Sequence, residues 1–230
     1  SMSRQASLGD MDGLKESLRF ALILIALFTV PAAVGLLLCA VPVFSLFFMS
    51  GAFGFEEVRQ SALALAFYAP GLFFLGISRV VVPAFYAMKN TRTPVWISFW
   101  TLLVNAGLGL ALMGPFKHLG LALALTLSSV FNGALLLWML RRVAGPLGLK
   151  PVITNLLRLI PVTVLMGVVV WTILQFGPWT EAGRHGLKAV VLVAAVSSGM
   201  LVYGVGCMAV RIPQAAEAYA LIRRKLGRRA

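Results

Sequence analysis

Residues 83-PAFYAMKNTRTPV-95 join two apolar runs through a short basic corner. Thr93 and Pro94 suit the cap and the first turn of a helix, because proline cannot continue a helix through its own N–H. Cations between two apolar runs anchor a turn at the cytoplasmic lipid headgroups. The stretch therefore predicts a tight cytoplasmic corner between two membrane-spanning helices. The residues of this predicted corner are Lys89, Asn90, Arg92, Thr93 and Pro94.

The composition also indicates a membrane protein. Of the 230 residues 60% are hydrophobic and 12% are charged, whereas soluble domains are nearer a quarter charged. The mean hydropathy is +0.94. The net charge of +13 comes from basic residues at the ends of apolar runs, which favours membrane anchoring over nucleic-acid binding. Cys39 and Cys207 lie inside apolar runs, so we expect small buried hydrophobes and no disulfide framework.

Six apolar runs are long enough to cross a bilayer, for which a helix needs about 20 residues. We expect helices, because an open sheet edge would leave backbone groups unpaired in lipid. The fold class predicted is therefore all-α, a polytopic membrane protein with six transmembrane helices. The predicted spans are Phe20–Val41, Ala62–Met88, Val95–Met113, Leu119–Leu140, Leu156–Phe176 and Ala189–Val210. Residues 70–78, rich in Gly and Pro, predict a bend in the second span, and the short apolar segment 42–53 is predicted to lie in the membrane interface.

The basic residues predict the orientation of these spans. Most of the 20 lysines and arginines fall before the first span, at the corner, between the fourth and fifth spans, and after the sixth. That side should face the cytoplasm, with both termini of the chain. Residues 212–229 have apolar residues at helical spacing among basic ones, which predicts an amphipathic helix on anionic lipid. The alternative is a frayed, solvated tail. Residues 1–13 are polar, lack the features of a signal peptide and resemble the continuation of a longer chain.

The sequence predicts no catalytic, metal or cofactor site. All seven acidic residues lie outside the predicted spans, and His118 and His185 lie at span edges far apart in sequence. Carboxylate pairs, proton relays and metal clusters would need such groups at depth. An enzyme is therefore not expected.

A few polar residues within the spans are candidates for function. Arg79 lies in the second span, about 15 Å from the basic corner at a helical rise, and an unpaired Arg in lipid costs at least about 2.5–3.5 kcal/mol. It is predicted to face a cavity, a partner or an anionic ligand, or alternatively to extend to the outer interface. Asn105, Thr126 and Asn132 are candidate cavity residues, with hydrogen bonding between helices as the alternative.

The line 74-FLGISRVVVPAFYAMKNTRTPV-95 resembles the MurJ (MviN) family of lipid II flippases, which has an Asp-Thr-Arg-Thr-Pro corner there. Asn90 replaces the usual Asp, so an ion pair through that acid is not expected. The stretch 3-SRQASLGD-10, residues 18–38 with 51-GAF-53, and residues 113–142 resemble the same family. The resemblance covers essentially the whole chain in order.

The resemblance implies a place for this chain in a larger fold. These flippases belong to the multidrug/oligosaccharidyl-lipid/polysaccharide exporter superfamily and have fourteen helices, in two six-helix lobes and a final pair. The chain would be the C-terminal part, beginning at the end of the eighth helix. Residues 1–19 would be a cytoplasmic loop and the end of the preceding helix, and 20–142 the four helices that complete the second lobe. Residues 143–210 would be the final pair, and 211–230 a basic cytoplasmic amphipathic tail.

The resemblance also implies a function. Such proteins move lipid II, an undecaprenyl-pyrophosphate-linked disaccharide-peptide, from the inner to the outer leaflet of the bacterial cytoplasmic membrane for cell-wall synthesis. The final helix pair forms a groove for the isoprenoid tail, which the small residues Gly167, Gly204 and Gly206 would leave open; close helix packing is the alternative for all three. Some members bind sodium through an Asn and an Asp on the third span. Here Asn105 is followed by Gly109, so a sodium site is not expected.

The expected partners are lipid II, an N-terminal lobe in the same or a separate chain, and anionic membrane lipids. Two other functions stay open at this point. One is export of another polyprenyl-linked oligosaccharide or of drugs. The other is a membrane scaffold that does not transport.

Overall fold

The computed structural model describes residues 10–50 and 53–210, and its elements in that part are helices, apart from one isolated bridge between Ser50 and Phe53. Six segments are long and apolar enough to cross a membrane, with α3 and α4 counted as one, which confirms the predicted six-span, all-α class. The helices are α2 (Met11–Phe47), α3 (Phe55–Tyr68), α4 (Gly71–Ala87), α5 (Arg92–Phe116), α6 (His118–Ala144), α7 (Lys150–Leu174) and α8 (His185–Ala209).

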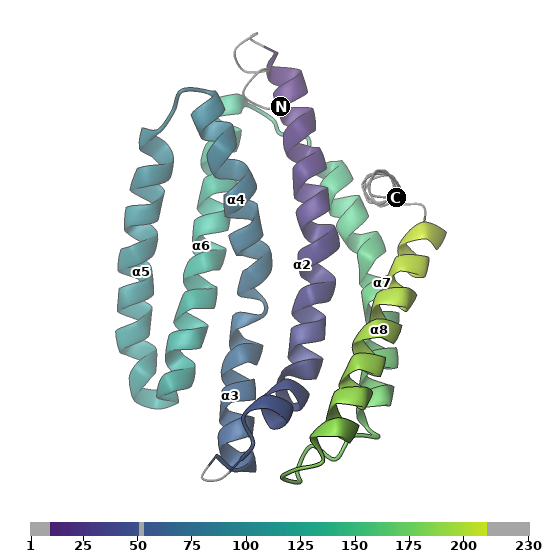
Figure 1. Ribbon diagram of the computed structural model, residues 1–230. Helices are drawn as coiled ribbons and strands as arrows, with labels where there is room; N and C mark the ends of the chain where they lie inside the picture. The colour runs from purple at the N-terminus through teal and green to yellow at the C-terminus, as the bar shows by residue number, and fades with distance from the viewer. Residues whose placement is uncertain (1–9, 51–52, 211–230) are drawn as a thin grey trace, which may run out of the picture.

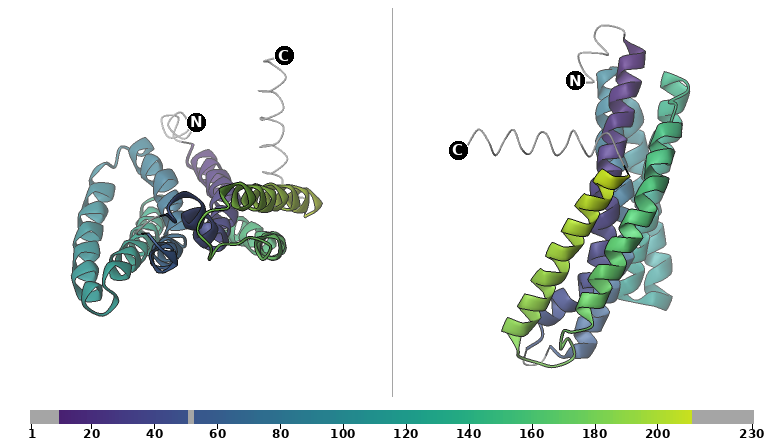
Figure 2. Two further views of the ribbon diagram at one scale, coloured as in Figure 1. Left: turned by 60° about the horizontal axis from the view of Figure 1, so that its bottom comes forward. Right: turned by 90° about the vertical axis from the view of Figure 1, so that its right-hand side faces the viewer.

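The helices run up and down in a bundle with α2 and α4 at its centre (Figure 1). The hairpin of α5 and α6 forms one edge, and α7 with α8 forms the other, as the view in the left part of Figure 2 also shows. α5 packs chiefly on α6, and α8 packs on α7 and α2. The start of α2, the α4–α5 corner and the α6–α7 connection lie at one end of the bundle, which we call the basic end (Figure 1).

α2 is longer than the predicted first span at both ends. Asp10 caps its start, since the Asp10 carboxylate accepts a hydrogen bond of 2.8 Å from the Gly13 N–H. Its 37 residues would extend about 55 Å, well beyond a hydrocarbon core of about 30 Å. Residues 42–47 continue α2, so the first half of the apolar segment 42–53 belongs to the first helix. That this segment lies in the membrane interface stays a prediction. The last turns of α2 bend aside (Figure 1), where Pro42 removes a helical hydrogen bond.

The predicted bend in the second span is a break between α3 and α4. Ala69 and Pro70 separate the two helices, and Pro70 has no N–H to continue the hydrogen-bond ladder. The Thr126 hydroxyl on α6 donates a hydrogen bond of 2.5 Å to the Phe67 carbonyl at the end of α3. A Cβ on Gly71 would lie 3.0 Å from the Thr126 hydroxyl oxygen, so the small residue lets α4 begin in close contact with α6.

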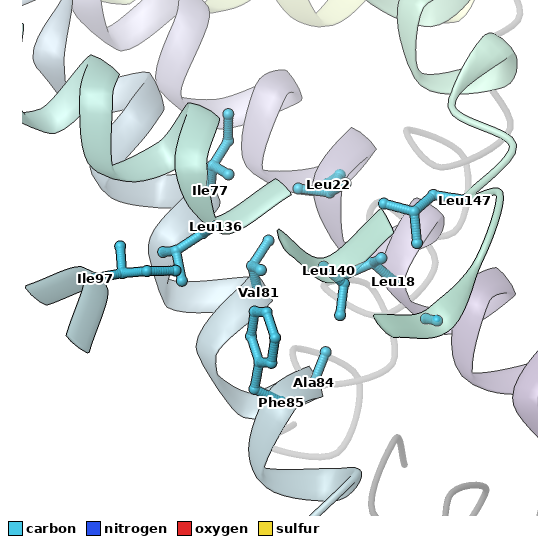
Figure 3. Close-up of a cluster of buried hydrophobic side chains, with 11 residues drawn as sticks. Leu18, Leu22, Ile77, Val81, Ala84, Phe85, Ile97, Leu136, Leu140 and Leu147 are labelled. Atoms are coloured by element: carbon cyan, nitrogen blue, oxygen red, sulfur yellow. The ribbon is translucent and has the colours of Figure 1, made fainter. Parts of the chain in front are cut away.

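A hydrophobic core holds α2, α4 and α6 together near the basic end. Phe85 and Val81 on α4 are fully buried and lie beside Leu136 and Leu140 on α6 and Leu18 on α2 (Figure 3). Burying a side chain of this size stabilises a fold by about 1.5–3 kcal/mol in water. In a bilayer the gain comes from packing instead, because lipid tails are as apolar as leucine. This core fixes α4, and with it the corner that follows.

Candidate functional site

An apolar groove of about 540 Å³ lies between α2, α7 and α8. Apolar side chains and glycines form nearly all of its walls. Figure 2, right, shows α7 and α8 side by side with α2 behind them. The residues that line the groove are Leu27, Phe28, Pro31, Ala32, Gly35, Leu36, Cys39, Val43, Met166, Val170, Val196, Gly199, Met200, Tyr203 and Gly204.

The three predicted groove glycines divide into two kinds. Gly204 lines the groove, and a Cβ there would meet nothing within 4 Å. Gly206 and Gly167 do not line the groove. A Cβ on Gly206 would lie 2.5 Å from Val162, so Gly206 serves close helix packing, whereas a Cβ on Gly167 would make an ordinary contact of 3.4 Å with Val34. Sequence reasoning missed Gly35, which lines the groove and is as open as Gly204.

Tyr203 closes the groove on one side through a hydrogen bond that sequence reasoning did not find. Its hydroxyl donates a bond of 2.7 Å to the Leu27 carbonyl on α2. In a regular helix that carbonyl would accept from residue 31, but Pro31 has no N–H. The tyrosine therefore satisfies a backbone acceptor that the proline leaves free, and it ties α8 to α2.

The other end of the helix pair is fastened by Lys188, which is fully buried. Its ammonium donates to the Ser45 hydroxyl oxygen at 2.8 Å and to the Glu181 carbonyl at 2.5 Å. The Ser45 hydroxyl in turn donates to the Trp179 carbonyl at 2.6 Å. The cation thus joins the last turns of α2 to the connection between α7 and α8. Sequence reasoning did not single out Lys188, although its position one turn into an apolar helix was an available signal.

Arg79 lies on an exposed stripe of α4. Leu75, Arg79, Pro83 and Tyr86 follow one another at spacings of three and four residues, and all four are exposed. Within residues 10–50 and 53–210, the Arg79 side chain makes no hydrogen bond or ion pair. The predicted partner of this guanidinium is therefore absent from the part of the chain that is described.

The other predicted polar residues have different surroundings. Thr126 is buried and bonds to the α3 end, as described above, and the Asn132 amide donates to the Ser78 hydroxyl on α4 at 3.1 Å. The Asn132 Oδ1 atom is buried without a hydrogen-bond partner. Asn105 lines a separate hollow of about 520 Å³ between α5, α6 and Tyr68. Gly109 lines the same hollow and brings no carboxylate to it.

The basic corner is built from backbone hydrogen bonds. Lys89 has a positive φ of 58°, the Asn90 N–H bonds to the Phe85 carbonyl, and the Lys89 N–H bonds to the Tyr86 carbonyl. This pattern is a Schellman motif, which ends α4. The expectation that Thr93 caps the next helix was wrong: α5 begins at Arg92, and the Asn90 side-chain oxygen accepts from the Thr93 N–H at 3.2 Å. Asn90 thereby supplies the acceptor that an aspartate would offer.

Pro94 is the third residue of α5, where a missing N–H leaves no helical bond unmade. Of the basic residues predicted to share one side, those that the structure describes belong to the start of α2, the corner and the α6–α7 connection, which all lie at the basic end (Figure 1). The others lie outside the described residues. In the described ranges no three His, Cys, Asp or Glu side chains gather as a metal site would require. Cys39 and Cys207 are buried free thiols, as predicted.

Comparisons with known proteins agree on one family. The family model described as "Lipid II flippase MurJ" matches residues 1–182. A probable lipid II flippase MurJ of Synechocystis is 28% identical over 216 residues, 92% of this chain and 40% of the relative. One of Bdellovibrio bacteriovorus is 26% identical over 179 residues, 77% of this chain and 34% of the relative. The chain thus spans between a third and two-fifths of the length of these relatives.

A solved structure shows the same fold. It is a lipid II flippase MurJ in an inward closed conformation, which matches with a TM-score of 0.73 and 23% identity over 91% of this chain and 41% of the other. The matched part is the C-terminal part of that fourteen-helix fold. The described helices, the corner and the family match together show that this chain belongs to the lipid II flippase MurJ family, as its C-terminal part.

Proposed function

We propose that this chain is part of a flippase that moves lipid II from the inner to the outer leaflet of the bacterial cytoplasmic membrane for cell-wall synthesis. The observation that carries the proposal is the apolar groove between α2, α7 and α8, in a member of a family named for this substrate. The groove would hold the isoprenoid tail while the headgroup crosses. Along α2 it runs from Leu27 to Val43, a length of about 24 Å at a helical rise.

An apolar groove suits the tail because the tail need not leave an apolar environment during transport. The glycines at positions 35 and 204 keep the groove open, since neither carries a side chain and a Cβ on either would touch nothing within 4 Å. Tyr203 places its only polar group on the Leu27 carbonyl, so the groove wall presents a satisfied backbone there.

The headgroup needs a different environment. Its pyrophosphate carries negative charge through a layer about 30 Å thick, and cations in a water-filled cavity would offset the loss of hydration. We propose that Arg79 contributes such a cation, facing a cavity completed by the N-terminal lobe. The inside-negative membrane potential would favour outward anion movement by about 2.3 kcal/mol per charge per 100 mV. The cavity must open first to one side of the membrane and then to the other, and this movement needs both lobes.

The proposed topology places the basic end and both termini in the cytoplasm. The predicted division at residues 19, 142 and 210 then assigns α2 to α6 to the second lobe and α7 with α8 to the final pair. The predicted amphipathic tail, 211–230, lies outside the described residues. Its contact with anionic lipids is part of the proposal.

Blocking the groove tests the tail site. In the full-length protein, Gly204→Phe places a large ring in the groove without meeting a neighbour at its Cβ. We expect this variant to reach normal membrane abundance but to fail to replace a depleted lipid II flippase in a growth assay. Gly107→Phe is the matched control, because Gly107 is equally open and lies on α5, outside the groove. Normal growth with Gly204→Phe would refute the tail site.

A second variant tests the cavity cation. Arg79→Ala should abolish lipid II translocation at wild-type abundance. Arg158→Ala is the matched control, since Arg158 is also an exposed guanidinium within a span, on α7. Normal lipid II translocation by Arg79→Ala would refute the role of Arg79 and leave the tail groove to be judged by its own test.

A further inference from the structure

A second apolar hollow, away from the groove, lies between α5 and α6 at the basic end. Its volume is about 360 Å³. Trp96 and Trp100 on α5 are 61% and 53% exposed and form one wall, and Leu135 and Met139 on α6 form the other. The left view of Figure 2 shows this hairpin at the opposite edge of the bundle from α8. The hollow is therefore independent of the proposed tail site.

Two guanidinium groups stand at the end of this hollow nearer the connections of the basic end. Arg92, the first residue of α5, lines the hollow and is exposed. Arg142 follows Met139 by three residues and Trp138 by four, so it lies on the same face of α6, one turn nearer the basic end. Its guanidinium carbon lies 3.9 Å from the centroid of the Trp138 ring, which fixes its position.

Neither arginine is neutralised by the part of the chain that is described. No ion pair forms at Arg92 or Arg142 within residues 10–50 and 53–210. The acidic residues described at this end, Asp10, Asp12 and Glu16, belong to the start of α2. Figure 1 and Figure 2 show α2 separated from α5 by α4 and α6. The mouth of the hollow is thus a site of unbalanced positive charge.

These features match one kind of ligand. Guanidinium groups bind phosphate oxygens in a bidentate manner, indole rings favour the level of lipid headgroups, and an apolar hollow below them accommodates an acyl chain. We propose that the α5–α6 hollow binds an anionic phospholipid, with its phosphate between Arg92 and Arg142 and an acyl chain along Trp96 and Trp100. A zwitterionic lipid fits less well, because the described residues offer no carboxylate at the mouth for its ammonium group.

Tryptophan quenching by brominated lipids tests the proposal. The full-length protein is placed in nanodiscs of phosphatidylcholine that contain either brominated phosphatidylglycerol or brominated phosphatidylcholine. The part of the quenching that is lost in the double variant Trp96→Phe/Trp100→Phe measures the lipid bound in the hollow. We expect half-maximal quenching at a mole fraction of phosphatidylglycerol about tenfold lower than that of phosphatidylcholine, since each basic side chain near an anionic lipid contributes roughly a fivefold factor before screening.

Charge variants identify the source of this preference. Arg92→Gln/Arg142→Gln should remove it, and raising the salt concentration should weaken it in the unchanged protein. Arg141→Gln/Arg158→Gln is the matched control, because it removes the same charge from exposed positions outside the hollow. Single variants and the salt series replace the double variant if it does not fold.

Three results would overturn the proposal. Equal quenching by the two lipids would mean ordinary boundary lipid. A preference that survives Arg92→Gln/Arg142→Gln or high salt would mean that the arginines do not hold the phosphate. No quenching at Trp96 and Trp100 by either lipid would mean that another part of the protein covers the hollow. Each of these results would leave the groove between α2, α7 and α8 unaffected.

Discussion

Replacing Tyr203 by Phe removes one oxygen atom and keeps the ring that lines the groove. The hydroxyl donates a hydrogen bond of 2.7 Å to the Leu27 carbonyl, for which Pro31 provides no helical N–H. In the variant this carbonyl faces apolar surroundings without a donor, since Leu27 is 5% exposed. We expect Tyr203→Phe to lower the free energy of unfolding and to loosen the contact between α8 and α2.

The magnitude follows from two considerations. Hydrogen bonds between membrane helices average about 0.6 kcal/mol and reach about 1.7 kcal/mol. A buried acceptor left without a partner costs about 1–3 kcal/mol. The Leu27 carbonyl has lost its helical donor as well, so the expected loss lies in the upper part of the first range, about 1–1.7 kcal/mol.

A double-mutant cycle isolates the reason for the loss. Pro31→Ala restores an N–H that can reach the Leu27 carbonyl within α2. In that background Tyr203→Phe should cost less than about 0.5 kcal/mol, which gives a coupling energy near 1 kcal/mol. The unfolding free energies of the four proteins are measured by titration with sodium dodecyl sulfate in mixed micelles, followed by circular dichroism. Equal costs of Tyr203→Phe with and without Pro31 would refute the reasoning.

Three further changes test other contacts by the same titration. Lys188→Met should cost about 2–3 kcal/mol, because it removes charged hydrogen bonds to the buried Ser45 hydroxyl and to the Glu181 carbonyl. Lys117→Met at an exposed position should cost little. Lys89→Gly should stabilise the protein by about 1 kcal/mol, because its φ of 58° is strained for a residue with a Cβ; a loss of stability would show that its ammonium matters more than its backbone. Gly206→Ala should destabilise by about 1–3 kcal/mol through its contact with Val162, and Gly204→Ala should be neutral; equal effects would contradict the different roles assigned to these glycines.

The spans could be predicted because a bilayer imposes a length on every crossing segment. Each apolar run between charges or Gly-Pro turns corresponds to a crossing. The ends of the helices were less predictable: α2 extends into polar residues from Met11, where Asp10 caps its start. The corner could be located from its charge, but its capping residue could not be predicted. The side chains of Asn90 and Thr93 can each accept a capping hydrogen bond from a backbone N–H. Which of the two caps α5 depends on where the turn that ends α4 lets α5 begin.

The partners of polar side chains were beyond sequence reasoning, because they depend on which helices approach. Thr126 meets the α3 end and Lys188 meets the end of α2, both across long separations in sequence. Asn132 was a candidate cavity residue with hydrogen bonding between helices as the alternative, and its amide bonds to Ser78 on α4 as in that alternative. Spacing along one helix shows which side chains share a face, but it does not show which carbonyl stands opposite.

Proline nevertheless provides a local signal for such partners. A proline within a helix deprives the carbonyl four residues earlier of its donor, so a polar group from elsewhere is needed there in lipid. Pro31 frees the Leu27 carbonyl, and Tyr203 supplies the donor. Pro83 likewise leaves the Arg79 carbonyl without the N–H that a regular helix offers, on the exposed stripe of α4.

At Arg79, then, one residue of an exposed helix face has a carbonyl that Pro83 deprives of its helical donor and a guanidinium without a partner among the described residues. Contact of that face with lipid would leave both groups without partners, at a cost of at least several kcal/mol. Water or another part of the protein would satisfy both groups, and the proposed cavity between two lobes would provide both. The backbone therefore supports the same location for the cavity as the side chain does, and Pro83→Ala gives the check. Restoring the N–H at position 83 should stabilise α4. Arg79→Ala should still abolish transport in the Pro83→Ala background.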